Sequence, residues 1–179
     1  MLTAEKTCLI VVDIQEKLFK LMYNRDRLEC NCVILIKMAQ VLNIPILWCQ
    51  QVPNALGPSI HPVWALLHEQ ESFDKTSFSC YGDEAFAAKL DEINPKSAII
   101  CGIEAHVCVF QTAMHLLEKG IDIHVIADAT SSRTNENKQI ALHRMDKEGV
   151  TLSSTEMCLF ELLGGSTHEK FRELAKLIK

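Results

Sequence analysis

The stretch Cys8-Leu9-Ile10-Val11-Val12-Asp13 decides the fold, because it is an unbroken apolar run that is closed by a carboxylate. Such a run is typical of a strand that is buried on both faces, as in a parallel sheet. A strand with one face in water would alternate apolar and polar residues instead. We therefore predict a parallel sheet with helices on both of its sides.

Stretches with helical or strand patterns follow this one along the whole chain. Strands are predicted over residues 46–49, 97–102, 121–127 and 150–152. Helices are predicted over residues 25–43, 83–93, 107–119, 137–147, 154–163 and 167–178. The proline- and glycine-containing residues 50–62 are predicted to form a long loop. Five strands alternating with helices indicate an α/β protein, a three-layer α/β/α sandwich with a mostly parallel central sheet and a Rossmann-like topology.

Length and composition narrow the class of function. The chain has 179 residues, of which 48% are hydrophobic and 23% charged, so one globular domain over residues 1–179 is expected. A formal net charge of -5 argues against nucleic-acid partners, which need clustered Lys and Arg, and favours a small-molecule substrate. The first residues carry no signal-peptide pattern and no apolar run is long enough to span a bilayer, so we expect a cytoplasmic protein without a membrane partner. Its eight cysteines lie inside apolar segments and are expected to be mostly reduced, buried thiols.

Polar residues mark the edge of the sheet where ligands of parallel α/β proteins bind. Asp13 directly follows the first strand, and Gly102-Ile103-Glu104-Ala105-His106-Val107-Cys108 joins another strand to its helix. No glycine-rich turn follows the first strand, since Asp13-Ile14-Gln15-Glu16 contains none. A dinucleotide site is therefore not predicted, and no cofactor is expected.

Three residue types in this pattern suggest nucleophilic catalysis. Cys108 is placed in the first turn of a predicted helix, where free N–H groups and the helix dipole favour the thiolate. A nearby ammonium, Lys75, would lower the thiol pKa further, and Asp13 could accept and return the proton. Each residue also has an ordinary structural interpretation. Cys108 could fill the core, Lys75 could be a solvated charge, and Asp13 could be a helix N-cap.

Three motifs resemble the isochorismatase-like cysteine hydrolase superfamily, which includes nicotinamidases and N-carbamoylsarcosine amidohydrolase. They are Val11-Val12-Asp13-Ile14-Gln15, Lys75-Thr76-Ser77-Phe78-Ser79 and Gly102-Ile103-Glu104-Ala105-His106-Val107-Cys108-Val109, in the family's order. The stretch Asp128-Ala129-Thr130-Ser131-Ser132-Arg133 adds a likeness to small isochorismatase-domain proteins. The resemblance runs nearly from end to end.

The resemblance implies a covalent mechanism. Cys108 would be the nucleophile, Asp13 the general acid and base, and Lys75 the cation that orients and activates the pair. The family also implies a cis peptide between Ile103 and Glu104, with an oxyanion hole made by the backbone N–H groups of Glu104 and Cys108. The expected reaction is hydrolysis of a small amide, ureido or related carbonyl substrate through a thioester on Cys108.

The chain departs from the metal-dependent members of the family. Nicotinamidases have an Asp-x-His pair and a further His where this chain has Gln50-Gln51 and, within the loop, His61. One imidazole with amides is a poor ligand set, so no metal site is expected. Gln51 is instead expected to contact the substrate, as a similar glutamine does in metal-free relatives, and Phe19 and Phe78 are candidates for the pocket wall.

Other roles stay open for the chain and for two residues of its third motif. His106 is expected to pack or to donate a hydrogen bond rather than to act as the base. The side chain of Glu104 could face a neighbouring loop. The chain could also be a catalytically silent binding or scaffold protein, since a fold does not guarantee an activity. Thiol redox chemistry lacks a Cys-x-x-Cys pair, and relatives that form dimers and larger rings imply a homo-oligomer.

Overall fold

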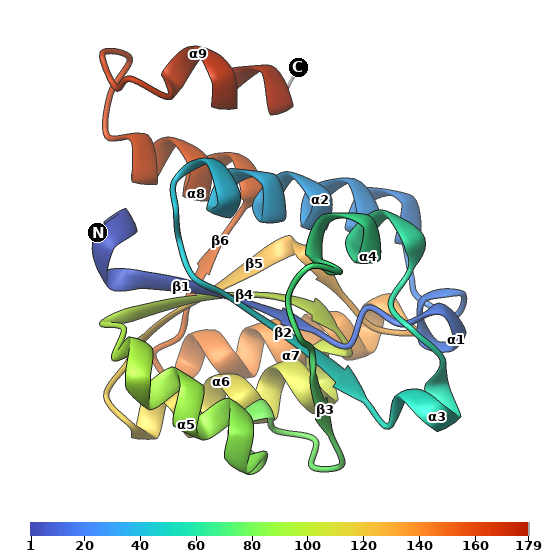
Figure 1. Ribbon diagram of the computed structural model, residues 1–179. Coiled ribbons are helices and arrows are strands. Elements are labelled where there is room, and N and C mark those ends of the chain that lie inside the picture. Colours follow the sequence, from blue (N-terminus) through green and yellow to red (C-terminus); the bar gives the residue numbers. More distant parts are fainter. Residues whose placement is uncertain (179) are drawn as a thin grey trace.

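A computed structural model of the protein describes residues 1–178. Within this range the chain forms one six-stranded parallel sheet in the order β3-β2-β1-β4-β5-β6 (Figure 1). The strands are β1 (Thr7–Val12), β2 (Ile46–Gln51), β3 (Phe73–Lys75), β4 (Ser97–Ile103), β5 (Asp122–Ser131) and β6 (Thr151–Ser153). The α/β class and the parallel sheet that the sequence predicts are confirmed.

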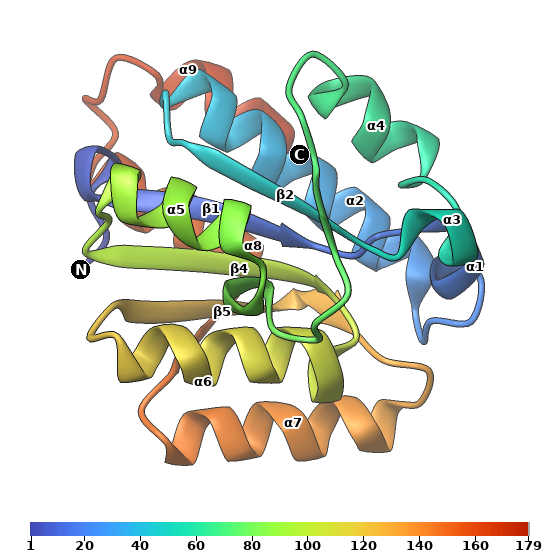
Figure 2. The same cartoon turned by 60° about the horizontal axis from the view of Figure 1, so that its bottom comes forward.

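Helices cover both faces of the sheet and complete the three layers. One face carries α2, α4, α8 and α9, and the other carries α5, α6 and α7 (Figures 1 and 2). The longer helices are α2 (Arg25–Val41), α4 (His61–Leu67), α5 (Glu84–Ile93), α6 (Phe110–Glu118), α7 (Asn135–Lys147) and α8 (Thr155–Leu163). The short ones are α1 (Glu16–Phe19), α3 (Pro53–Leu56) and α9 (Phe171–Leu174), with 3-10 turns at Ala4–Lys6, Cys80–Gly82 and Ala175–Leu177.

The first strand explains why the apolar run of the sequence is unbroken. All six residues of β1 are buried, and successive side chains enter opposite layers. Leu9 and Val11 join the core under α2 and α8, whereas Cys8, Ile10 and Val12 join the core under α5, α6 and α7. Each strand with such a run therefore contributes side chains to both cores. The burial of this apolar surface is the main term that stabilises the fold.

The strand order reverses beside β1. The chain runs from β1 outward through β2 to β3, and then returns to place β4 on the other side of β1. The residues that follow β1 and β4 therefore emerge next to each other at the carboxyl edge of the sheet. This is the position where open α/β sheets bind their ligands.

The structure differs from the sequence predictions at four places. A sixth strand, β3, was not predicted, because its three residues include Asp74 and Lys75 and lie at the edge of the sheet. The predicted loop 50–62 contains α3 and the start of α4, two short helices that begin at or next to prolines. The predicted helix 167–178 is reduced to α9 and a 3-10 turn. The helix predicted over 107–119 begins with a π-helical turn over Ala105–Val109, and α6 follows it.

Gly102 allows β1 and β4 to lie close together next to the reversal point. Its φ is +123°, a conformation that side chains with a Cβ rarely adopt, and a Cβ here would collide with the backbone carbonyl of Val12. Replacing Gly102 with alanine is therefore expected to lower the free energy of unfolding by at least about 2 kcal/mol, as measured by urea denaturation.

The control for this substitution is Gly149→Ala. Gly149 also has a positive φ, of +98°, but nothing lies within 4 Å of its added Cβ. Alanine at position 149 is therefore expected to lower the free energy of unfolding by only about 1 kcal/mol, which is the cost of a side chain at a positive φ. Equal losses at the two positions would contradict a steric role of Gly102 between the strands.

Candidate active site

The three residues expected to carry the chemistry come from three different strands and meet at the carboxyl edge of the sheet. Asp13 directly follows β1, with a φ of 50° that turns the chain away from the strand direction. Lys75 is the last residue of β3, and Cys108 lies in the π-helical turn after β4. All three are buried, with exposed fractions of 0% for Asp13, 1% for Lys75 and 6% for Cys108.

The ammonium of Lys75 is fixed by protein groups alone. Its Nζ lies 2.7 Å from Oδ2 of Asp13 and donates to Oε1 of Gln51 at 2.6 Å. The backbone carbonyls of Phe78 and Ser77 accept further hydrogen bonds at 3.2 and 3.3 Å. Burial alone would favour the neutral amine, but Asp13, together with the neighbouring thiols of Cys80 and Cys108, outweighs it and raises the pKa of Lys75 above its usual value. Lys75 is therefore a permanent, oriented cation.

The second oxygen of the Asp13 carboxylate, Oδ1, is buried and has no hydrogen-bond partner among the described residues. Burial raises the pKa of Asp13, although the charge of Lys75 opposes the shift and the neighbouring thiol of Cys108 opposes it further. A carboxylate with a raised pKa and a free oxygen is a stronger proton acceptor than an exposed one. Asp13 can thus take a proton from a neighbouring group.

The thiol of Cys108 differs from the activated thiolate that the sequence suggests. Burial raises the pKa of Cys108 well above its usual value, the charge of Asp13 acts in the same direction, and Lys75 only partly opposes them. Desolvation outweighs the helix terminus because the sulfur has left water almost completely. The resting group is therefore a thiol, which would have to lose its proton before it could act as a nucleophile.

Two glutamines hold the strand ends in place. The side-chain amide of Gln51 accepts from Lys75 and donates through Nε2 to the carbonyl of Thr76 at 2.8 Å. Gln15 bonds both backbone groups of Gln51, accepting from its N–H at 2.8 Å and donating to its carbonyl at 3.0 Å. Gln51 thus positions Lys75, and its contact with a substrate stays a prediction. The sequence analysis missed Gln15, although it belongs to the same motif as Asp13.

The turn after β4 presents backbone donors near the sulfur. The peptide bond between Ile103 and Glu104 is cis. The Glu104 carbonyl accepts hydrogen bonds from the N–H groups of Val107 and Val109. It accepts none from the N–H group of Cys108, which lies between them in the described chain. No acceptor for the Glu104 N–H is found within residues 1–178. Both amides expected to form the oxyanion hole therefore lie in, or directly before, the turn that carries Cys108.

The side chains of this turn are held by the loop after β5. Glu104 accepts from Nε of Arg133 at 2.9 Å, and Nδ1 of His106 lies 2.9 Å from Oγ of Ser132. The hydrogen-bonding role expected for His106 agrees with this contact. The motif around Cys108 and the stretch 128–133 are thus joined in space.

The two aromatic candidates differ in their surroundings. Phe78 has an exposed side chain and contributes its backbone carbonyl to Lys75, while Phe19 is partly buried against the core of α2. Their contact with a substrate stays a prediction. The best-formed cavities in the described part of the chain are not lined by Asp13, Lys75 or Cys108.

Metal-binding, membrane-spanning and disulfide features can be assessed from the same described residues. Residues 1–178 contain no cluster of three His, Cys, Asp or Glu side chains placed to hold a metal ion. None of the helices in this range has the length and apolar character needed to cross a bilayer. All eight cysteines are free thiols, and Cys30 is the exposed one.

Comparisons with known proteins place this geometry in context. The family model of the isochorismatase domain matches residues 7–157. Isochorismatase domain-containing protein 2 of Danio rerio is 33% identical over 177 residues, which cover 99% of this chain and 89% of that protein. The solved structure of MAR1 ribonuclease from Caenorhabditis elegans is 35% identical, with a TM-score of 0.92 and coverages of 99% and 91%. The YcaC gene product of Escherichia coli, described as an octameric hydrolase of unknown specificity, has a TM-score of 0.93 at 23% identity, with coverages of 99% and 88%.

Proposed function

The chain belongs to the isochorismatase-domain family, and from this premise we propose that it is a hydrolase whose nucleophile is Cys108. The proposed substrate is a small amide, ureido or related carbonyl compound, and the C–N bond is the one cleaved. The observation that carries the proposal is the buried ion pair of Lys75 and Asp13 at 2.7 Å, beside a thiol and with one carboxylate oxygen left free. A charge pair without water is costly to bury, so its retention at a sheet edge indicates chemical use.

The first half of the proposed reaction forms a thioester. Asp13 takes the thiol proton while the sulfur attacks the carbonyl carbon of the substrate. The tetrahedral intermediate collapses, the C–N bond breaks, and the leaving nitrogen takes the proton from Asp13. Ammonia or a small amine leaves, and the acyl group stays on the sulfur of Cys108.

The second half returns the enzyme to its starting state. A water molecule gives a proton to Asp13 and attacks the thioester carbonyl. The C–S bond breaks, the acid or carbamate product leaves, and the sulfur regains its proton from Asp13. Lys75 keeps its charge throughout, because its pKa is raised by Asp13, and it holds the carboxylate in one orientation.

The oxyanion of both tetrahedral intermediates would be bound by the N–H groups of Glu104 and Cys108. This assignment is supported by the hydrogen bonds of the Glu104 carbonyl, which accepts from the N–H groups of Val107 and Val109 but not from that of Cys108. Oriented backbone donors in a site without bulk water stabilise a developing oxyanion more than water does. The Arg133 contact fixes Glu104 and thereby the direction of its amide.

Alkylation with iodoacetamide tests the proposed proton transfer. Because burial raises the pKa of Cys108, unassisted labelling should rise about tenfold per pH unit across the neutral and mildly alkaline range. If Asp13 accepts the proton, labelling of Cys108 in the unmodified protein should instead depend only weakly on pH between about 6 and 9. The rate at each cysteine is measured by peptide mass spectrometry.

Asp13→Asn is the matched variant for this measurement, since asparagine keeps the shape and tolerates the positive φ of this position. The variant should label Cys108 at least about tenfold more slowly at pH 7 and should recover the steep pH dependence. The exposed thiol of Cys30 serves as an internal reference whose rate must stay unchanged. Equal rates at Cys108 in both proteins would contradict the role of Asp13.

The substrate class is tested by a screen for turnover. Small compounds are favoured because Cys108 is only 6% exposed, which leaves little room for a bulky group beside it. The screen should contain primary amides, ureido acids and thioesters. The relative from C. elegans is described as a ribonuclease, so a short RNA belongs in the screen as well.

A binding or scaffold protein without turnover is the second candidate. It is favoured by one observation, the burial of Cys108 as a thiol with a raised pKa. Selective labelling of Cys108 combined with failure of every compound in the screen would support this candidate over the hydrolase.

Assembly and location complete the proposal. Because the similar YcaC gene product is described as octameric, we include a homo-oligomer of two or more copies in the proposal. Light scattering measures the mass directly, and a mass of one chain would contradict it. A cytoplasmic location and the absence of nucleic-acid, cofactor and metal partners stay predictions of the sequence.

A further inference from the structure

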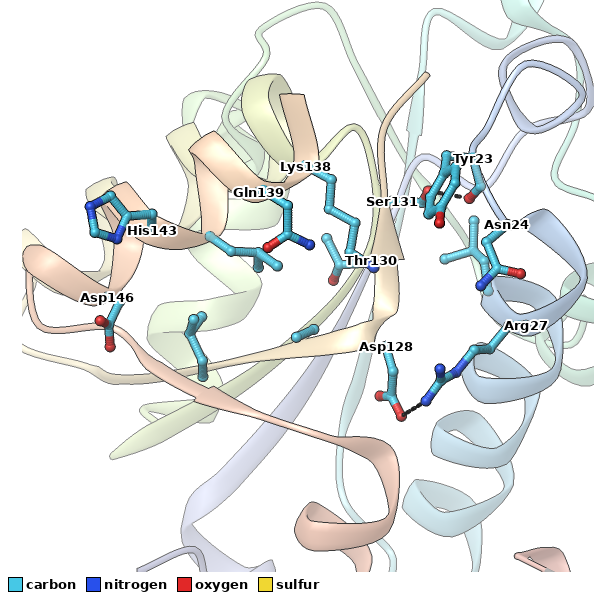
Figure 3. A pocket seen from close by; sticks show the side chains of 14 residues that line it. Tyr23, Asn24, Arg27, Asp128, Thr130, Ser131, Lys138, Gln139, His143 and Asp146 are labelled. Atoms are coloured by element: carbon cyan, nitrogen blue, oxygen red, sulfur yellow. Dashed lines mark hydrogen bonds and ion pairs between the residues drawn. The ribbon is translucent and has the colours of Figure 1, made fainter. Parts of the chain in front are cut away.

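A separate cavity lies where the sheet is left incomplete. Strand β6 pairs with β5 only at residues 124–126, so the second half of β5 has no neighbouring strand on that side within residues 1–178. The space between this edge, α2 and α7 forms a cavity of about 490 Å³ (Figure 3). None of the proposed catalytic residues lines it. Its volume is in the range of cavities that hold small organic ligands.

One polar group in the cavity wall lacks a partner. Thr130 is 1% exposed and lines the cavity, yet its Oγ1 has no hydrogen-bond partner among the described residues. Buried hydroxyl groups are almost always hydrogen bonded, because the loss of water is otherwise not offset. The orphaned hydroxyl of Thr130 therefore indicates a partner that enters the cavity.

A cation lies beside this hydroxyl. The side chain of Lys138 extends from α7 toward Thr130 (Figure 3), is half-buried, and forms no ion pair within residues 1–178. Burial lowers the pKa of Lys138, which Asp128 opposes and Arg27 reinforces. The charge of Asp128 thus only partly offsets the loss of water around this ammonium, which has no ion-pair partner of its own within residues 1–178.

The nearest carboxylate is already used. Oδ1 of Asp128 accepts from both the N–H and the hydroxyl of Thr155 at 2.8 and 2.9 Å, which fixes the start of α8. Its Oδ2 lies 3.6 Å from Arg27 (Figure 3). His143 and Asp146 lie at the other end of the cavity from Thr130 and Lys138. A negative charge on a ligand would therefore find two cations and a hydroxyl at one end.

We propose that this cavity binds a small organic anion, a carboxylate or phosphate ester, whose charged group contacts Lys138 and Thr130 with Arg27 at the rim. The organic part would rest on the leucines of the wall, which are Leu28, Leu142 and Leu152. A bare ion would leave this apolar surface unused. The site is independent of the proposed catalysis, since it shares no residue with it.

The proposal is tested by amide NMR titration of the full chain with three probes, which are inorganic phosphate, phenyl phosphate and benzoate. Saturable shifts are expected at Thr130, Ser131 and Lys138, with at least one of the two aromatic probes bound more tightly than inorganic phosphate. Lys138→Gln should weaken binding by about tenfold or more, since a charge-assisted contact is lost. Thr130→Val, which keeps the shape of the side chain, should weaken it by a smaller factor.

The matched control is Lys147→Gln, on the same helix but exposed and outside the cavity. It removes the same charge and should change the affinity less than about twofold. Spectra of the free variants report whether each one is folded. No saturable shift with any probe in the folded parent chain, or equal affinities of the Lys138→Gln and Lys147→Gln variants, would overturn the proposal.

Discussion

Replacing Cys108 with serine is expected to lower turnover by at least about a thousandfold, which corresponds to roughly 4 kcal/mol of transition-state stabilisation. The hydroxyl is similar in size but far less nucleophilic, and its proton is harder for Asp13 to remove. Turnover is measured as kcat/KM on the best small amide from the screen. The mass of the intact protein should show an acyl adduct in the parent chain and none in the variant.

The control for this variant is Cys158→Ser. Cys158 is also fully buried and its pKa is likewise raised by burial, but it lies in α8 in the core on the other face of the sheet. This change should cost stability and leave kcat/KM within a few-fold of the parent. Full activity of Cys108→Ser would end the proposal that this sulfur is the nucleophile.

Replacing Lys75 with methionine is expected to have the largest effect on stability. The variant leaves the carboxylate of Asp13 buried and without its ion pair, since Oδ2 loses the 2.7 Å contact and Oδ1 has no partner in the described chain. Breaking one half of such a buried pair costs about 3–5 kcal/mol. Urea denaturation at pH 7 measures the loss.

Combining Lys75→Met with Asp13→Asn separates the charge from the packing. Asparagine removes the unpaired charge and tolerates the φ of 50° at this position. The double variant is expected to regain a large part of the lost stability, while it remains inactive. A double variant as unstable as Lys75→Met alone would show that the stem of Lys75, rather than its charge, was needed.

The stability of Lys75→Met should also depend on pH. Burial raises the pKa of Asp13 and Lys75 opposes the shift, so without Lys75 the pKa rises further. The folded variant then keeps a proton that the unfolded chain releases above its pKa of about 3.9. Stability therefore falls as the pH rises above about 4, and the gap to the parent chain should be smaller at pH 4 than at pH 7.

The fold could be predicted where burial leaves a strong local pattern. The runs at residues 8–13, 97–102 and 121–127 are mostly apolar because both faces of each strand are covered, and the corresponding strands are β1, β4 and β5. The strand β3 escaped prediction because it has three residues, of which one is exposed, and gains its pairing from β2. The short helix α3 and the first residues of α4 were predicted as loop, because prolines occur in loops and also at the start of helices.

The residues of the candidate site could be predicted from the sequence, but their pKa shifts and mutual contacts could not. The resemblance of three motifs pointed to Asp13, Lys75 and Cys108, which the fold brings together. The sequence predicted a lowered pKa for Cys108, whereas burial raises it. This prediction was wrong because the desolvation of the sulfur depends on all the residues that pack around it. The role of Gln51 toward Lys75 was also missed, since a contact between β2 and β3 was needed to see it.

The sequence by itself determined the layers of the protein, because the spacing of apolar residues specifies which faces of a strand or helix are buried. Tertiary structure alone decided the contact between Lys75 and Asp13, which lie 62 residues apart, and the open edge of β5, where Thr130 has no hydrogen-bond partner among residues 1–178. Both depend on which strands become neighbours and where they stop. These are properties of the whole packed chain, since burial and charge act through space and not along the sequence.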